Sequence, residues 1–217
     1  MSISLQMPFK FKGGNAEPEL SVENAQLVQS LHGNHYEDCL AGRVYSHTPT
    51  PAGLAIPIFT GTALAGGMPI WNPANSNVNV ELISVSINRA SGTAAVLSVG
   101  LMHRNDLGVD VATGSEITVF AETTPLNGLL GAGTTSKVRS SNAGTVTVTA
   151  GVAAEFVRAL FGSGIEADTH TNGISYLFHN FDGTVIVPPG SMVWLGAKLA
   201  SVALYNSTIV WKEIPIR

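Results

Sequence analysis

The stretch VNVELISVSI, residues 78–87, decides the fold class of this 217-residue chain. Apolar residues occupy alternate positions from Val78 to Leu82, and the alternation then changes phase and resumes from Ile83 to Ile87. A period of two is the pattern of a β-strand with one buried face. A β-bulge inserts one extra residue into a strand and so changes the phase of the pattern. We therefore predict one strand with a bulge at the phase change.

Similar runs of alternating, β-branched and aromatic residues recur along the rest of the chain. They cover residues 55–60, 93–102, 116–122, 144–150, 174–181, 183–187, 192–197 and 203–214. Turn-forming pairs such as Asn127-Gly128 and Asp182-Gly183 separate most of them. Short strands at this spacing predict an all-β fold, a single jelly roll or β-sandwich. Residues 152–161 (VAAEFVRALF) favour a short helix by composition, although the flanking glycines would also bracket a strand.

The N-terminal residues 1–50 differ in composition and predict an extended arm, followed by the jelly-roll domain at 51–217. Ser21 suits a helix N-cap and Gly33 suits the position just after a helix end, which predicts one short helix at about 21–32. A helix this short with so few apolar side chains is marginal in water, so it must pack on something. Its own domain and another protein are both open as its partner.

Charge and cysteine content exclude several classes of protein. Lys and Arg number 11 and Asp and Glu number 15, so only 12% of the residues are charged, against about 25% in an average domain. Without clustered basic residues, nucleic acid is excluded as a main partner. Cys39 is the only cysteine, which rules out an intramolecular disulfide and suits a reducing cytoplasm. No segment resembles a signal peptide or a membrane helix, so we expect no export and no membrane partner.

The charge deficit is concentrated in residues 44–88, where Glu81 is the only Asp, Glu, Lys or Arg. Edge strands normally carry charges that prevent association. The edges in this region must therefore be covered, either by the chain's own loops or by another subunit, and we expect sister subunits.

Candidate chemical motifs are few. The loop Gly131–Lys137 resembles a phosphate loop but lacks the glycine that must precede its lysine. His32, His35 and Cys39 have metal-ligand spacing, yet no second cluster completes a zinc site. Neither an H-x-H metal pair nor a G-x-S-x-G motif occurs. We therefore predict no enzymatic activity, no catalytic residues, no cofactor and no metal.

The three tryptophans lie in or near predicted strands. Trp194 and Trp211 are predicted core residues, with anchoring between subunits as the alternative. Trp71 lies in the charge-free region beside Asn72-Pro73, which makes it a candidate for an interface or for stacking on a sugar.

Several segments together resemble the minor structural proteins of tailed bacteriophage virions. They are LHGNHYEDCLAGRVYS (31–46), AGLAIPIF (52–59), WNPANSNVNVEL (71–82), DGTVIVPPGSMVWLGA (182–197) and VWKEIP (210–215). The resemblance covers most of the chain and implies a single jelly roll with an N-terminal arm. Members of such families often form trimers that decorate or cement the capsid, and others are head or tail fibre modules. This chain has no collagen-like, coiled-coil or repeated stalk, which argues against a tail fibre.

The sequence thus predicts a capsid cement or decoration protein on the outer surface of a phage head, assembled in the host cytoplasm. Its expected partners are the major capsid protein and itself, as a homotrimer. The predicted partner-binding residues are Leu27, Leu31, Tyr36, Arg43, Tyr45 and Trp71. The alternative is a tail, baseplate or head-fibre module that binds a host glycan or another virion protein. An enzyme acting on polysaccharides is the third hypothesis.

Overall fold

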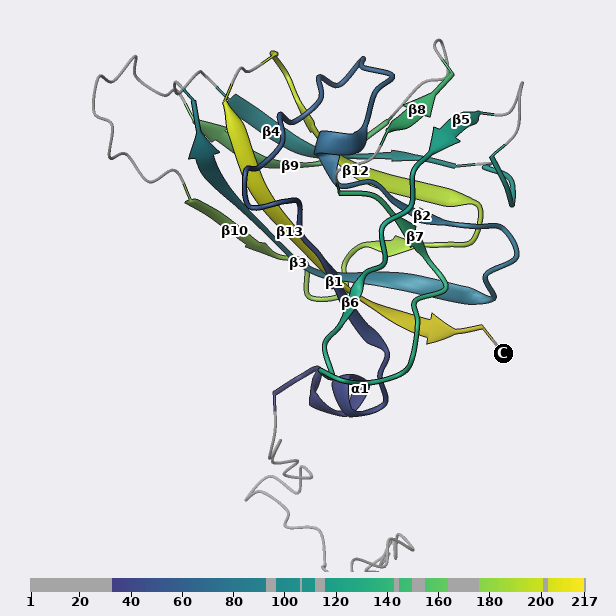
Figure 1. Ribbon diagram of the computed structural model, residues 1–217. Coiled ribbons are helices and arrows are strands. Elements are labelled where there is room, and N and C mark those ends of the chain that lie inside the picture. Colours follow the sequence, from purple (N-terminus) through teal and green to yellow (C-terminus); the bar gives the residue numbers. More distant parts are fainter. Residues whose placement is uncertain are drawn as a thin grey trace, which may run out of the picture. The chain divides into compact units, whose positions relative to one another are not determined.

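Antiparallel β-sheets packed as a sandwich make up the fold in this computed structural model (Figure 1). The structure describes residues 33–92, 97–105, 107–111, 116–142, 145–149, 155–163, 176–200 and 203–216. The prediction of an all-β sandwich is confirmed. The predicted helix at about 21–32 lies outside the described residues, whereas the α-helix that the structure does describe is α1, Tyr36–Leu40.

Two sheets form the sandwich. Sheet I has the strand order β10-β3-β13-β1-β6, with β11 also paired to β3. Its strands are β1 (Val44–His47), β3 (Val78–Ser91), β6 (Leu126–Asn127), β10 (Tyr176–Asn180), β11 (Ile186–Val187) and β13 (Leu204–Pro215). Sheet II has the order β7-β2-β12-β4-β9. Its strands are β2 (Ile70–Asn72), β4 (Leu97–Arg104), β7 (Arg139–Ser140), β9 (Glu155–Ser163) and β12 (Ser191–Ala197).

The predicted bulge in β3 is confirmed by the pairing of β3 with β13. Val210 pairs with Ser84 but Trp211 pairs with Leu82, so Ile83 has no partner on β13. The extra residue keeps the apolar side chains on both sides of it facing the same core, since Leu82 and Val85 are both buried while Ile83 and Ser84 are not. The phase change in the sequence is therefore the signature of this bulge.

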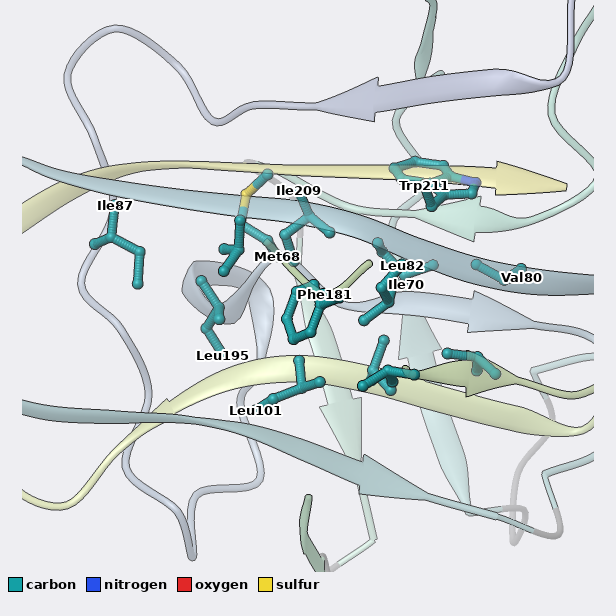
Figure 2. Packing of buried hydrophobic residues seen from close by; sticks show 14 of the residues in the cluster. Met68, Ile70, Val80, Leu82, Ile87, Leu101, Phe181, Leu195, Ile209 and Trp211 are labelled. Atoms are coloured by element: carbon teal, nitrogen blue, oxygen red, sulfur yellow. The ribbon is translucent and has the colours of Figure 1, made fainter. Parts of the chain in front are cut away.

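The main core lies between the two sheets. Figure 2 shows Leu82 and Ile209 of sheet I above Leu101 and Leu195 of sheet II, with Phe181 between them. All five side chains are almost completely buried. Phe181 precedes a tight turn in which Asp182 and Gly183 both have positive φ and the amide of Thr184 donates to the carbonyl of Phe181. The predicted Asp-Gly turn thus places an aromatic ring at the centre of the sandwich.

A second core lies on the opposite face of sheet II. It is built by Leu64, Trp71, Met102, Leu107, Ile117, Phe120, Val146, Val148, Met192 and Trp194. The paired strands β5 (Ile117–Phe120) and β8 (Val146–Val148) supply four of these side chains. Every residue of β12 is buried, because its side chains point alternately into the two cores. Sheet II is therefore an inner layer, covered by sheet I on one face and by the β5–β8 pair on the other.

Residues 152–161 are a strand where the sequence predicts a short helix. Residues 155–163 form β9, which pairs antiparallel with β4 at the edge of sheet II. The pairing has two irregularities, in which Val157 and Leu160 are the extra residues. Bulges three residues apart disrupt the period of two and imitate a helical spacing, which explains the wrong prediction.

The segment 55–60 was predicted as a strand, but the structure gives it only isolated bridges. Ile58 bridges to Ala197, and Leu54, just before the segment, bridges to Tyr205. Pro57 has no amide proton to donate to a ladder, which limits pairing here. The segment still contributes Ile56 to the main core.

The charge-poor strands lie inside the sheets. Strand β1 lies between β13 and β6, β2 lies between β12 and β7, and β3 lies between β13 and the strands β10 and β11. Their edges are therefore covered by the chain itself, and the expectation that sister subunits cover them is corrected. Strand β1 also precedes the predicted domain start at residue 51, so the sandwich includes residues 44–47.

A buried histidine joins the two sheets and generates the first prediction. His47 of β1 is 3% exposed, and its Nδ1 lies 3.2 Å from the hydroxyl of Ser140 on β7. Burial lowers the pKa of His47 to about 4, against a smaller opposing effect of a hydrogen bond with the Ser141 backbone. The unfolded chain takes up a proton near pH 6.5, while the folded chain resists protonation down to about pH 4.

We therefore expect His47 to reduce the free energy of unfolding as the pH falls from 7 to 4, by up to about 3 kcal/mol. Urea denaturation at several pH values, for the wild type and for His47→Gln, measures this effect. As the pH falls from 7 to 4, the free energy of unfolding of the wild type should decrease relative to that of His47→Gln. A difference that does not depend on pH would contradict the assignment.

Candidate contact surface

The most distinctive surface feature is a corner formed by residues 37–43 and 126–137, which we name the α1–β6 corner. Strand β6 pairs with β1 at the edge of sheet I, with Tyr45 opposite Asn127 and Ser46 opposite Leu126. The amide of Gly128 continues the contact by donating to the carbonyl of Val44. Helix α1 and β6 lie beside each other at this end of the sandwich (Figure 1).

Asn127 organises the corner through its side-chain amide. Its Nδ2 donates to the carbonyl of Gly42 at 2.8 Å and to the hydroxyl of Thr134 at 2.9 Å. Its Oδ1 accepts a hydrogen bond of 2.8 Å from the amide of Leu129. One side chain therefore links the end of α1, the turn after β6 and the following loop. The sequence indicates Asn127 only as a turn former, but in the structure its side chain also joins three segments of the corner.

Cys39 packs directly against the glycine of the same turn. A Cβ atom added to Gly128 would lie 2.8 Å from Cys39 Sγ, which is closer than such contacts allow. The thiol is half-buried and unpaired. Gly128 is therefore required by the close approach of α1, and Cys39 acts here as a packing residue.

A network of charges fastens α1 to sheet I. Lys212 of β13 lies 3.3 Å from the carboxylate of Asp38 and 3.0 Å from that of Glu81, while Arg43 lies 2.7 Å from Asp38. Burial alone would lower the pKa of Lys212, but the hydrogen bonds and charges of Glu81 and Asp38 outweigh it and raise that pKa. Lys212 therefore stays charged and bridges the helix to the sheet.

The loop before β7 is held by a buried carboxylate. Glu213 is 6% exposed, and it accepts hydrogen bonds from the Ser136 hydroxyl and from the backbone amide of Lys137. The amide of Lys137 lies 3.2 Å from both carboxylate oxygens. These are the residues that gave the sequence its likeness to a phosphate loop. In the structure this loop does bind an anion, and the anion is a side chain of the same chain.

Large apolar side chains project from this polar framework. Leu40 of α1 is 51% exposed, Leu126 of β6 is 68% exposed and Leu130 is 87% exposed. They come from two segments that the hydrogen bonds of Asn127 and the contact of Cys39 hold together. Exposed apolar groups gathered on one part of a surface mark candidate sites of protein contact.

The six predicted partner-binding residues have different positions in the structure. Leu27 and Leu31 lie outside the described residues. Tyr36, the first residue of α1, is 42% exposed, and the Arg43 side chain is 44% exposed. These two are available for contact, with Arg43 already paired to Asp38.

Tyr45 and Trp71 are buried, so neither belongs to a contact surface of the folded chain. Tyr45 is 3% exposed and stacks on Trp211 with ring centroids 6.1 Å apart. Burial and the nearby charge of Glu213 raise the pKa of Tyr45, and hydrogen bonds with Thr134 and Asn127 oppose that rise. Trp71 has no exposed surface and belongs to the second core. The charge-free sequence around Trp71 reflects burial on both faces of sheet II.

Sequence reasoning missed the exposed leucines. The pattern Leu126-Asn-Gly-Leu129-Leu130-Gly indicates a turn, and a turn was all that was predicted from it. The signal that could have identified the surface is the presence of leucines within a glycine-rich turn, where polar residues are usual. Leu40 offered no such signal.

The described residues contain no group of three or more His, Cys, Asp or Glu side chains placed to hold a metal ion. Of the three candidate metal ligands His32, His35 and Cys39, His32 lies outside the described residues. Among the described helices, none is long and apolar enough to span a membrane.

Comparisons of the chain with protein-family models, with curated proteins and with solved structures found no match.

Replacement of the buried carboxylate tests the framework of the corner. We expect Glu213→Gln to lower the free energy of unfolding by about 1–3 kcal/mol, because the amide turns one of the acceptors into a donor facing the Lys137 amide. Limited proteolysis should then cleave residues 126–137 faster. Glu122→Gln is the matched control, since Glu122 is an exposed partner of Arg139. Equal losses in the two variants would contradict the structural role of Glu213.

Proposed function

We propose that the protein is a non-enzymatic structural protein of a tailed-bacteriophage virion, a cement or decoration protein that binds the major capsid protein through the α1–β6 corner. The proposal places it on the outer surface of the head, as a homotrimer. The observation that carries the choice of surface is the exposure of Leu40, Leu126 and Leu130 on a corner braced by Asn127 and Glu213.

The physical argument is that binding by contact needs a preformed apolar surface. Fully burying one leucine side chain contributes about 1.5–3 kcal/mol. A surface that is already ordered loses little conformational entropy on binding, and the polar contacts beneath the leucines provide that order. Because many copies would bind to one shell, a modest binding free energy per copy would add up to a large stabilisation of the shell.

The segment that precedes α1 has a place in the same proposal. It contains Leu27 and Leu31, which stay predicted contact residues, and it leads through Gly33 into α1. Tyr36, at the start of α1, and Arg43, just after its end, would then extend the contact. Tyr45 and Trp71 are left out because they are buried.

The alternative, a glycan-binding tail or baseplate module, loses its candidate stacking residue. An aromatic ring must be accessible to stack on a sugar, and Trp71 has no exposed surface. Phe178 of β10 is 57% exposed and is a described aromatic residue that could take over this role.

The proposal is tested by Leu126→Ser combined with Leu130→Ser in the full-length protein. We expect affinity for empty phage shells that lack the protein to fall by about a hundredfold or more, because two anchoring side chains are lost. Thermal stability should change little, since both leucines are exposed. Cosedimentation of the protein with shells gives the affinity.

Leu199→Ser is the control, because Leu199 is 56% exposed in the loop after β12, outside the corner. The control should bind shells like the wild type. Unchanged binding by the double variant would overturn the choice of the α1–β6 corner. Failure of the wild type itself to bind shells would overturn the proposed function.

A further inference from the structure

Arg104 is a buried arginine with no hydrogen-bond partner among the described residues. It is the last residue of β4 and is only 3% exposed. It lies directly opposite Met192 of β12, whose side chain belongs to the second core. Residues opposite each other in an antiparallel pair share a face, so Arg104 lies on the face of sheet II that β5 and β8 cover.

None of its guanidinium nitrogens is hydrogen-bonded. Nε, Nη1 and Nη2 of Arg104 are all buried and unpaired, and no ion pair joins Arg104 to any residue in the part of the chain that the structure describes. Glu116, just before β5, acts on the guanidinium through its charge. Burial lowers the pKa of Arg104, and the charge of Glu116 only partly offsets the effect.

The same face of sheet II carries further unpaired donors. The indole Nε1 atoms of Trp71 and Trp194, on the same face of sheet II, are also buried without a partner. Trp71 lies opposite Met192 on β2, so Trp71, Met192 and Arg104 form one row across three strands. An arginine and an indole can only donate hydrogen bonds. Among the described residues, no carboxylate therefore hydrogen-bonds the guanidinium of Arg104, and Glu116 acts on it through its charge alone.

An unpaired buried charge is costly, and a close-fitting apolar residue would be more stable in its place. A guanidinium presents its donors as a planar fork, which matches the oxygens of a phosphate or a carboxylate. We propose that Arg104 binds a small free oxyanion, of the phosphate type, at the end of β4 in sheet II. This inference is independent of the proposed function.

The experiment compares melting temperatures in sodium phosphate and in sodium chloride at equal ionic strength, with inorganic phosphate as the probe. We expect phosphate to raise the Tm of the wild type by about 5–10 °C at a hundredfold excess over its Kd. Phosphate also stabilises proteins generally, by exclusion from their surface. Arg104→Met corrects for that general effect, because it keeps the length of the side chain and removes the site.

Arg43→Met is the second control, since it removes an exposed arginine with its own ion pair and should keep the full phosphate effect. In chloride, Arg104→Met should melt at or above the wild-type temperature, because an unpaired buried charge has been removed. In phosphate the order should reverse. Equal phosphate shifts in the wild type and Arg104→Met would overturn the proposal.

Two further measurements test whether phosphate binds at Arg104. Isothermal titration of the wild-type protein with phosphate should give one site per chain, and the absence of saturable binding would also overturn the proposal. Glu116→Gln tests whether Glu116 is itself the partner of Arg104 in solution. If the site is free, the wild type binds phosphate and removal of the Glu116 charge strengthens that binding. Phosphate binding by Glu116→Gln but not by the wild type would assign Arg104 to Glu116 and overturn the proposal.

Discussion

The constraint on which the rest of the structure depends is that sheet II is covered on both faces. Strand β12 is buried at every position, with Val193 and Leu195 in the main core and Met192 and Trp194 in the second core. A strand buried on both faces is predominantly apolar and carries few of the charges that usually mark a surface. The low charge content of the chain therefore has a structural cause within the monomer, and it needs no second subunit to explain it.

The same constraint determines where the molecule can make contacts. With β1, β2 and β3 inside their sheets, the strands of the charge-poor region present no free edge. The α1–β6 corner differs because Asn127 and the buried Glu213 hold it together through internal hydrogen bonds, while its leucines are left outside. A rigid polar base with apolar side chains on its outer surface is well suited to binding another protein. The proposed attachment to a capsid shell depends on this arrangement.

Local patterns in the sequence predicted the features that depend on neighbouring residues. The bulge at Ile83 and the turn at Asp182-Gly183 were predicted because alternation and turn chemistry are visible within a few residues. Strand β9 was predicted as a helix because its two bulges conceal the alternation. The corner was missed for a different reason. Its geometry depends on contacts between distant residues, such as Glu213 with Lys137, which are 76 positions apart and leave no local pattern.

The covering of sheet II is tested most directly by quenching of tryptophan fluorescence with iodide. Trp71, Trp194 and Trp211 are the only tryptophans, and each is at most 1% exposed. In the native wild-type protein, iodide should leave the emission almost unchanged until the chain is unfolded. If the β5–β8 pair did not cover sheet II, Trp71 and Trp194 would be accessible while Trp211 stayed protected between the sheets. Quenching of the larger part of the native emission would therefore contradict the account.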